Sequence, residues 1–293
     1  MTTVDVLVIG EALIDIVRTP DGAVEHVGGS PANVALGLGR RGIDVALLTQ
    51  IGADDRAAMI QEHLRRSGVT VRDESVSLAR TSTAVAHLGP DGSASYDFDI
   101  VWDSFPEPEG LRSRILHTGS IAAFLAPGDD SVRAILRSAD AGLVTFDPNI
   151  RPALVGDHVR ALALFEETCR LAHVVKMSDE DAAWLLPDRT PEQAVDAVLA
   201  WGPSLVVVTL GSDGALLGGG DIRVHVPAVR VSAVDTIGAG DTFMASLLVS
   251  LARDGMPRTE AEIAAMGGRA VRAAAITVSR AGADLPWAAE LED

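Results

Sequence analysis

The stretch VDTIGAGDTFMASLL, residues 234–248, combines a glycine turn, two carboxylates and the start of a predicted helix. Gly238, Ala239 and Gly240 can bring successive backbone N–H groups close to a ligand, and the positive end of the helix dipole adds to their field. Asp241 lies at the mouth of this predicted anion hole, where a carboxylate would repel phosphate, so we expect it to accept a proton from a hydroxyl group. The stretch therefore indicates phosphoryl transfer to an alcohol.

The same stretch has a structural alternative, a tight turn in which Asp241 or Thr242 caps the following helix. However, the order of the stretch is a turn, then a carboxylate, then an apolar run at Phe243, Met244, Ala245, Leu247 and Leu248. A helix start that faces a ligand requires this order, and we therefore favour a functional site.

Composition limits what the chain can be. With 293 residues, 47% of them hydrophobic, it can bury a large core. The strongest apolar stretches, residues 4–9 and 205–210, have the length of strands, and no basic segment precedes an apolar run at the N-terminus. We therefore expect a cytoplasmic protein with no membrane partner. The net charge of −17 argues against a nucleic-acid partner.

Cysteine and lysine each occur once. Cys169 excludes an intrachain disulfide and a cluster of cysteine metal ligands, and its apolar neighbours predict a core position. Lys176 is the one lysine among 24 Lys and Arg residues, either because a compact ammonium group is needed there or as an ordinary surface lysine. Four scattered histidines, His63, His87, His117 and His173, lack metal-ligand spacing and are predicted to be structural.

Apolar runs of strand length alternate with amphipathic helical stretches along most of the chain. The predicted strands are residues 4–9, 45–49, 115–118, 143–146, 174–176 and 205–209, and the predicted helices are residues 31–41, 54–67, 129–139, 158–171 and 191–201. This alternation predicts an α/β fold, a three-layer α/β/α sandwich around a mainly parallel, doubly wound sheet.

Two segments interrupt the alternation, residues 12–27 and 83–98. Each carries short alternating runs separated by an Asp-Gly pair, at residues 21–22 and 91–92, which is a hairpin signal. We expect a small β-sheet lid, inserted in a single domain that spans residues 1–293.

A second glycine-rich stretch, VGGSPANVALGLGRRG, occupies residues 27–42. Its end, GLGRRG, matches the dinucleotide-binding pattern, but it closes a predicted helix and leads into a strand, which is the reverse of the order that a dinucleotide fold requires. At its start, Gly28 and Gly29 can let backbone approach a ligand, and the Asn33 amide can bond sugar hydroxyls. A plain loop into a helix that starts with proline explains the same residues equally well.

Taken together, the motifs resemble the ribokinase-like (PfkB) carbohydrate kinases. The motifs that carry the resemblance are GEALID, GGSPANVALGLGRRG, FDPNIRPAL (residues 146–154), KMSDED (176–181), TLGSDGA (209–215) and VDTIGAGDTF. They cover almost the whole chain in the right order, and the wording GEALID, SPANVA and DPNIR is most similar to the fructokinase branch. The resemblance implies phosphorylation of a primary hydroxyl of a neutral monosaccharide by ATP, with D-fructose as the expected substrate.

The resemblance also implies roles for individual residues. Asp241 would be the base, and Gly238, Ala239 and Gly240 would stabilise charge on the phosphoryl oxygens. Residues expected to hold the sugar are Asp15, Gly28, Gly29 and Asn33; those expected to hold ATP are Lys176, Ser178, Thr209, Gly211, Ser212 and Gly214. Asp181 would reach Mg²⁺ through water. A monovalent cation, usually potassium in many relatives, would be held by Asp235, Ile237, Thr277, Arg280 and Gly282.

Some positions depart from the family pattern or stay open. Ser178 stands where many relatives have Asn, and Asp181 stands where the pattern has Glu. The acidic residues near the lid, Asp97, Asp99 and Asp103, fit either a neutral sugar or nucleoside or a solvated lid edge. Arg151 fits either a substrate contact or an anchor for its own loop through Asp147.

Other substrates and one other class of protein are compatible with the same motifs. The alternative substrates are 2-keto-3-deoxygluconate, ribose and adenosine. The alternative class is a sugar-binding regulatory protein that has lost the chemistry, which the intact GAGD stretch disfavours. A homodimer that closes through lid strands is also compatible, because exposed sheet edges tend to pair.

Overall fold

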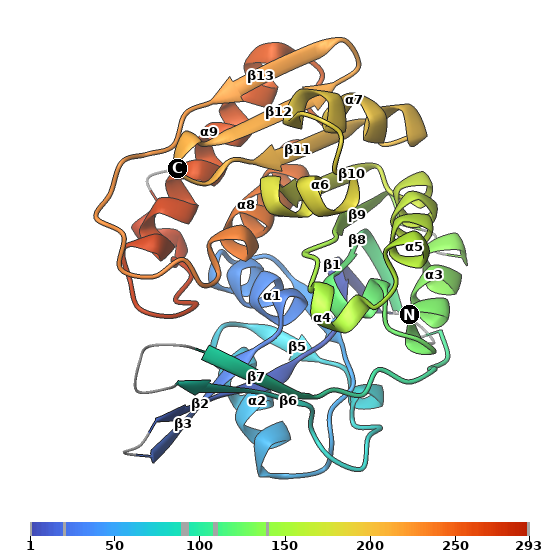
Figure 1. Cartoon of the computed structure of the whole chain (residues 1–293), viewed down its shortest axis with the longest axis vertical. Coiled ribbons are helices and arrows are strands. Elements are labelled where there is room, and N and C mark those ends of the chain that lie inside the picture. The colour runs from blue at the N-terminus through green and yellow to red at the C-terminus, as the bar shows by residue number, and fades with distance from the viewer. Residues whose placement is uncertain (1, 20–21, 89–93, 108–110, 139–140, 292–293) are drawn as a thin grey trace.

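A nine-stranded sheet forms the centre of the molecule in the computed structural model, which describes residues 2–19, 22–88, 94–107, 111–138 and 141–291 (Figure 1). Its strand order is β13-β12-β11-β10-β9-β8-β1-β4-β5. The bounds are β1 (Thr2–Ile9), β4 (Val45–Leu48), β5 (Val69–Val71), β8 (Leu111–Gly119), β9 (Leu143–Asp147), β10 (Val174–Ser178), β11 (Leu205–Thr209), β12 (Ala215–Gly219) and β13 (Ile222–Val226).

The sheet is doubly wound, as the sequence predicts. From β1 the chain first adds β4 and β5 on one side, and later adds β8 to β11 on the other, all in parallel. At one edge of the described sheet, β12 pairs antiparallel with β11, and β13 pairs antiparallel with β12. The winding direction therefore changes between β1 and β8, which is the place where open α/β sheets bind ligands.

Helices cover both faces of the sheet and complete the predicted three layers. One layer consists of α1 (Ser30–Arg40), α2 (Asp55–Arg66), α8 (Ala239–Asp254) and α9 (Glu260–Val278). The other contains α3 (Gly128–Ser138), the short α4 (Pro152–Val155), α5 (His158–Leu171), α6 (Asp179–Leu185) and α7 (Pro191–Trp201). Side chains alternate along each strand: in β1, Val6 and Val8 face the first layer, whereas Leu7 and Ile9 face the second.

Most predicted elements occur within a few residues of their expected bounds. The strand expected at residues 174–176 continues to Ser178, and the helix expected at 31–41 begins at Ser30 and ends at Arg40. The GLGRRG stretch runs from α1 into the loop before β4, so its interpretation as a helix end is confirmed. Cys169 is fully buried in α5, as predicted.

A separate four-stranded sheet contains the two segments that interrupt the alternation. Its order is β3-β2-β6-β7, with β2 (Leu13–Thr19), β3 (Gly22–Gly28), β6 (Thr83–Leu88) and β7 (Ala94–Asp99). Each segment forms an antiparallel pair, as predicted, and β2 pairs with β6 in parallel. Asp21 and the pair at residues 91–92 lie outside the described residues. Ile14 and Ile16 on one face of this sheet share the core with Ile60 and Leu64 of α2.

Aromatic packing between the sheet and the second helical layer offers a test of the fold. The Phe165 ring on α5 is fully buried, with ring centroids 5.9 Å from Phe146 and 5.7 Å from Trp201. Val159, on the same helix, is 73% exposed. We expect Phe165→Ala to lower the free energy of unfolding by about 3–5 kcal/mol because it leaves a cavity. Val159→Ala should change it by less than about 0.5 kcal/mol.

Urea denaturation of the two variants and the wild type provides the measurement. Equal effects of the two substitutions would contradict the assignment of α5 to the second layer with Phe165 facing inward.

Candidate active site

The predicted site residues gather at the carboxyl ends of the parallel strands. Asp147 ends β9, Ser178 ends β10 and Thr209 ends β11, while Glu11 is the second residue after β1. The N-termini of α1 and α8 lie at the same place, because two residues of the first turn of α1 bond Asp241 in the first turn of α8. The topology therefore brings the motifs of distant segments together.

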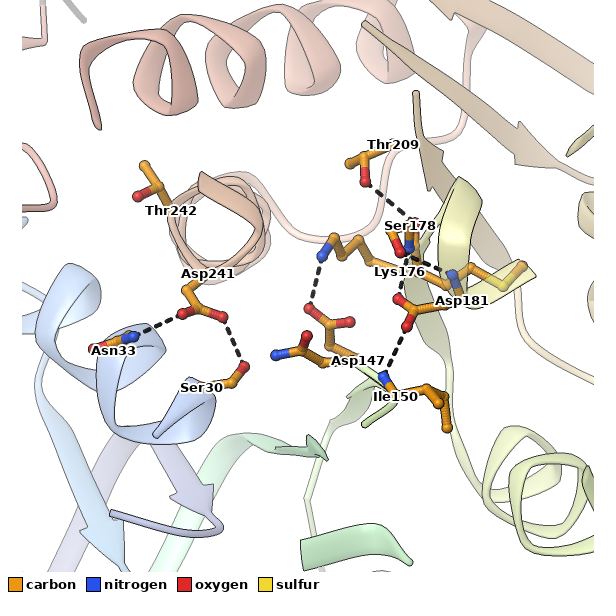
Figure 2. Close-up of polar contacts among 12 residues, drawn as sticks. Ser30, Asn33, Asp147, Ile150, Lys176, Ser178, Asp181, Thr209, Asp241 and Thr242 are labelled. Atoms are coloured by element: carbon orange, nitrogen blue, oxygen red, sulfur yellow. Dashed lines mark hydrogen bonds and ion pairs between the residues drawn. The ribbon is translucent and has the colours of Figure 1, made fainter. Parts of the chain in front are cut away.

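Asp241 is buried, with 8% of its surface exposed, and both of its carboxylate oxygens accept hydrogen bonds (Figure 2). The Ser30 hydroxyl donates to Oδ1 at 2.7 Å, and the Asn33 amide donates to Oδ2 at 2.8 Å. Both donors come from α1 and are three residues apart, so that they lie on one face of that helix. Asn33 thus contacts the predicted base, a role that the sequence did not indicate, and Ser30 was not predicted at all.

The capping alternative for this stretch is not what the structure shows. The N-cap of α8 is Gly238, with a φ of 77°, and no side chain caps the helix. The Thr242 hydroxyl donates to the Gly238 carbonyl at 2.8 Å and shares a hydrogen bond of 2.8 Å with the Thr277 hydroxyl. Asp241 is therefore held for another purpose than capping.

The GAGD turn presents backbone N–H groups, as expected of an anion hole. The Ala239 N–H donates to the Thr236 carbonyl at 3.2 Å. Within the described part of the chain, the N–H groups of Gly240 and Asp241 make no hydrogen bond, as is usual in the first turn of a helix. A side chain at Gly238 would meet Ala283 at 2.8 Å, so glycine is required there by space as well as by φ.

Lys176 lies directly beneath this turn and forms a buried ion pair. Its Nζ lies 2.8 Å from Asp147 Oδ2, with both side chains at most 4% exposed, and a Cβ added at Gly240 would lie 3.0 Å from that Nζ. Burial opposes the charge of the ammonium group, but Asp147, Asp181 and Asp241 together hold the pKa of Lys176 above its usual value. The interpretation of Lys176 as a surface lysine is wrong.

Asp181 and Ser178 form the capping box of α6. Asp181 Oδ1 accepts from the Ile150 N–H at 2.7 Å and Oδ2 accepts from the Ser178 N–H at 2.9 Å, while the Ser178 hydroxyl accepts from the Asp181 N–H at 2.9 Å. These bonds connect the loop after β9 to the end of β10. The sequence pattern indicated a metal-water ligand and missed this structural role.

A cavity of about 550 Å³ adjoins the GAGD turn. All four residues predicted for the nucleotide turn, Thr209, Gly211, Ser212 and Gly214, line it, and so do Ala239 and Gly240. Its other walls are mainly apolar and include Val229, Val231, Phe243, Val271, Ala275 and Val278. Lys176 and Ser178 are not among the lining residues. The apolar walls were missed because the loop before α8 and the helix α9 were not recognised in the sequence.

On the lid side, the structure brings Asp15, Gly28 and Gly29 together. A Cβ added at Gly28 would lie 1.9 Å from Asp15 Oδ2, and one added at Gly29 would lie 2.5 Å from the Glu11 carbonyl oxygen. Asp15 on β2 lies opposite His26 on β3 in the register of the antiparallel strand pair. The two glycines therefore let the backbone lie close to Asp15 and Glu11. That they also let it approach a ligand stays a prediction.

Arg151 is exposed and its side chain is anchored by its own loop. Its Nη1 donates to Asn149 Oδ1 at 2.7 Å and to the carbonyls of Asn149 and Ile150 at 3.2 and 3.1 Å. The expected anchor through Asp147 is wrong, since Asp147 pairs with Lys176. Burial raises the pKa of the Glu11 carboxyl group to about 7. The positive charge of Arg151 acts in the opposite direction and lowers that pKa.

The acidic residues of the lid have local partners. Asp97 lies 2.9 Å from His87, Asp99 lies 2.9 Å from Arg80, and Asp103 accepts from the N–H of the next residue. These contacts favour the interpretation of a solvated lid edge over that of a substrate filter.

Residues of the predicted monovalent-cation site meet beside the start of α8. Asp235 Oδ1 accepts from the Ile237 N–H at 3.0 Å and Oδ2 accepts from the Gly282 N–H at 2.9 Å. Thr277 lies against Thr242, whereas the Arg280 side chain turns to Asp284 and Glu290. Among the described residues, no three acidic, histidine or cysteine side chains are grouped so that together they could hold a metal ion.

The predicted structural role of the histidines can be compared with their contacts. His117 is buried beside Thr145, with Nδ1 and Oγ1 3.0 Å apart, and His173 Nδ1 accepts from the Val144 N–H at 3.0 Å.

No helix in the described part of the chain has both the length and the hydropathy to cross a bilayer.

Comparison with known proteins adds independent evidence to this geometry. A model of the pfkB family carbohydrate kinases matches residues 4–290. The chain belongs to this family. It is 33% identical to fructokinase of Salmonella typhimurium over 267 residues, 86% of each chain, and 33% identical to fructokinase of Escherichia coli over 307 aligned positions, 98% of each. The chain is thus an ATP-dependent sugar kinase.

Solved structures share the architecture. A double mutant of fructokinase from Vibrio cholerae, with fructose, ADP and potassium bound, superposes with a TM-score of 0.83 at 27% identity, over 97% of this chain and 94% of that one. Aminoimidazole riboside kinase from Salmonella enterica, with its riboside and an ATP analogue, gives a TM-score of 0.81 at 25% identity, over 99% and 98%. The ribokinase-like fold of the PfkB kinases is therefore confirmed.

The buried pair beneath the turn leads to a test of stability. We expect Lys176→Met to lower the free energy of unfolding by about 3–5 kcal/mol, because it leaves Asp147 buried without a partner. The double variant Lys176→Met, Asp147→Asn should recover part of this loss, because it removes the second charge as well. Urea denaturation of both single variants and the double variant measures the coupling; additive losses would contradict a direct pair.

Proposed function

We propose that the chain transfers the γ-phosphate of ATP to the primary hydroxyl of D-fructose, giving fructose 6-phosphate and ADP. The observation that carries the proposal is the position of Asp241, which bonds Ser30 and Asn33 of α1 and directly follows Ala239 and Gly240, two residues that line the cavity. The fructokinase relatives and the fructose-bound neighbour support this choice of sugar.

In this mechanism Asp241 takes the proton from the attacking hydroxyl, which becomes the nucleophile. The N–H groups of Gly240 and Asp241, at the positive end of α8, stabilise the charge on the phosphoryl oxygens. The nucleotide is held by Thr209, Gly211, Ser212 and Gly214. The apolar walls of the cavity surround its adenine ring. Asp15, Gly28 and Gly29 bind and orient the sugar, and Arg151 contacts it from the opposite loop.

The chemistry that Mg²⁺ would supply, when bound with ATP, is neutralisation of charge on the phosphate oxygens. Asp181 would hold it through water. The donor set fits this role, because each Asp181 oxygen uses one hydrogen bond and retains a lone pair, and because Asp147 Oδ1 is buried without a hydrogen-bond partner. Lys176 keeps its charge under the turn rather than reaching the nucleotide.

Potassium is the monovalent cation that we propose for the site around Asp235. The carboxylate of Asp235 and the backbone carbonyls of Ile237, Thr277, Arg280 and Gly282 offer oxygen ligands, which suit such an ion. A cation there would fix the loop that precedes Gly238 and so shape the anion hole. The potassium-bound neighbour supports this choice of ion.

A riboside is the second candidate substrate, favoured by the likeness to aminoimidazole riboside kinase. We also propose that the enzyme acts in the cytoplasm, and that a homodimer forms through the exposed edges of the lid sheet. The phosphoryl-transfer chemistry is the same with either acceptor and in either oligomeric state.

Replacement of Asp241 tests the mechanism. We expect Asp241→Asn to lower kcat by about 10²–10⁴-fold, with a smaller change in the sugar KM, because the amide cannot take the proton. Release of ADP should be measured with fructose, ribose, 2-keto-3-deoxygluconate and adenosine. Asp97→Asn, at an exposed lid position, is the matched control and should keep its turnover.

Two results would overturn parts of this proposal. Unchanged turnover in Asp241→Asn would eliminate Asp241 as the base. Tight binding of a sugar without any turnover in the wild type would favour the regulatory protein instead.

Removal of potassium tests the cation site. We expect replacement of potassium by choline at constant ionic strength to lower turnover severalfold, and Asp235→Ala to lose that dependence, because the carboxylate that faces the ion is gone. Identical turnover in the two salts would eliminate the cation site and leave the role of Asp241 intact.

A further inference from the structure

The hydroxyl of Ser30 is used in an unusual way. A serine at the start of a helix ordinarily bonds a nearby backbone N–H group and caps its own helix. Here α1 has no side-chain cap, its N-cap is Gly29, and the Ser30 hydroxyl donates instead to Asp241, 211 residues away in the sequence. The side chain of the first residue of α1 therefore bonds a residue of α8 rather than its own helix.

This contact has the geometry that the substrate itself needs. A hydroxyl that gives its proton to a carboxylate base must lie about 2.6–3.2 Å from one of its oxygens, and Ser30 Oγ lies 2.7 Å from Asp241 Oδ1. The other oxygen is bonded to Asn33, and the whole residue is only 8% exposed. Figure 2 shows that Ser30 covers Oδ1 and Asn33 covers Oδ2, so a sugar hydroxyl that gives its proton to Oδ1 meets the hydroxyl of Ser30 there.

The backbone that carries Ser30 is held firmly in place. Gly29 has a φ of 102°, and a Cβ there would lie 2.5 Å from the Glu11 carbonyl oxygen. Pro31 packs so closely on Gly10 that a Cβ at Gly10 would lie 2.3 Å from its ring. The side chain of Ser30 can therefore rotate away from Asp241, whereas the backbone that carries it stays in place.

We propose that Ser30 is a positioning residue whose hydroxyl occupies Asp241 Oδ1 until the acceptor hydroxyl of the sugar displaces it. The inference rests on the proposed function, with Asp241 as the base. In the absence of sugar, the Ser30 hydroxyl excludes water from Oδ1, so that ATP is not hydrolysed. When sugar binds, its hydroxyl replaces that of Ser30, and part of its binding energy offsets the lost contact.

The test compares Ser30→Ala with the wild type in two assays, ADP release without sugar and turnover of fructose. We expect Ser30→Ala to raise sugar-independent ATP hydrolysis by about fivefold or more and to lower the fructose KM by about threefold, with a smaller change in kcat. A residue with only a structural role would not produce this combination. Ser30→Thr keeps the hydroxyl and should behave like the wild type, and Ser30→Cys gives the same comparison if the alanine variant does not fold.

The outcomes are distinguishable from those of the proposed function. If the wild type turns over a sugar but ATP hydrolysis is no faster in Ser30→Ala, the role of Ser30 is overturned and the kinase assignment stands. Mass spectrometry that finds phosphate on Ser30 after incubation with ATP also overturns it, because the hydroxyl would then be an acceptor. If no sugar is turned over by the wild type, the proposed function fails and this inference falls with it. The double variant Ser30→Ala, Asp241→Asn should lose the sugar-independent ATP hydrolysis that Ser30→Ala gains. That loss would support the inference.

Discussion

In the proposed mechanism, the start of α8 has to hold a carboxylate and attract an anion within one turn, and the surrounding structure can reconcile these two demands. Asp241 would repel a phosphoryl group if its charge were unopposed, yet it must be ionised to take a proton. The helix dipole and the N–H groups of Gly240 and Asp241 favour the anion. Lys176, buried under Gly240, adds a full positive charge that three carboxylates hold in place.

This arrangement depends on the winding of the sheet. Because β1 and β8 lie side by side and the chain winds outward from them, the loops that follow β1, β9, β10 and β11 open at one edge. α1 and α8 then meet on one face of the sheet, with Ser30 and Asn33 against Asp241. The four-stranded lid sheet joins the same core through Ile14 and Ile16, and Asp15, between them on β2, lies beside Gly28.

Local patterns in the sequence predicted much of this structure because local physics decides it. The strand at residues 205–209 is a continuous apolar run, and Thr190 with Pro191 marks the start of α7. The GAGD turn was predictable because its glycines and its carboxylate are neighbours in the chain. The strand β12 and the helix α9 were missed, since their apolar residues are mixed with glycine or alanine and give a weak signal. The strand β13 was missed although apolar and polar residues alternate along it.

The contacts that the sequence could not predict join distant segments. Whether Lys176 is buried depends on Asp147, 29 residues earlier, and whether Asn33 faces a sugar or Asp241 depends on a helix 208 residues later. The capping box of Ser178 and Asp181 is local, but the bond from Ile150 that completes it is not. Residue types thus indicated the chemistry of the site, whereas tertiary packing decided which residue performs each part.

The charge balance of the site also explains how a buried carboxylate can act as the base. In the resting protein, Asp147, Asp181 and Asp241 surround one ammonium group, that of Lys176. In the proposed mechanism, Asp241 would become neutral by taking the proton of the acceptor hydroxyl at the moment when negative charge gathers on the phosphoryl oxygens beside it. The total charge around Lys176 would then change little as the reaction proceeds, because the negative charge that Asp241 loses is replaced by negative charge on the phosphoryl oxygens.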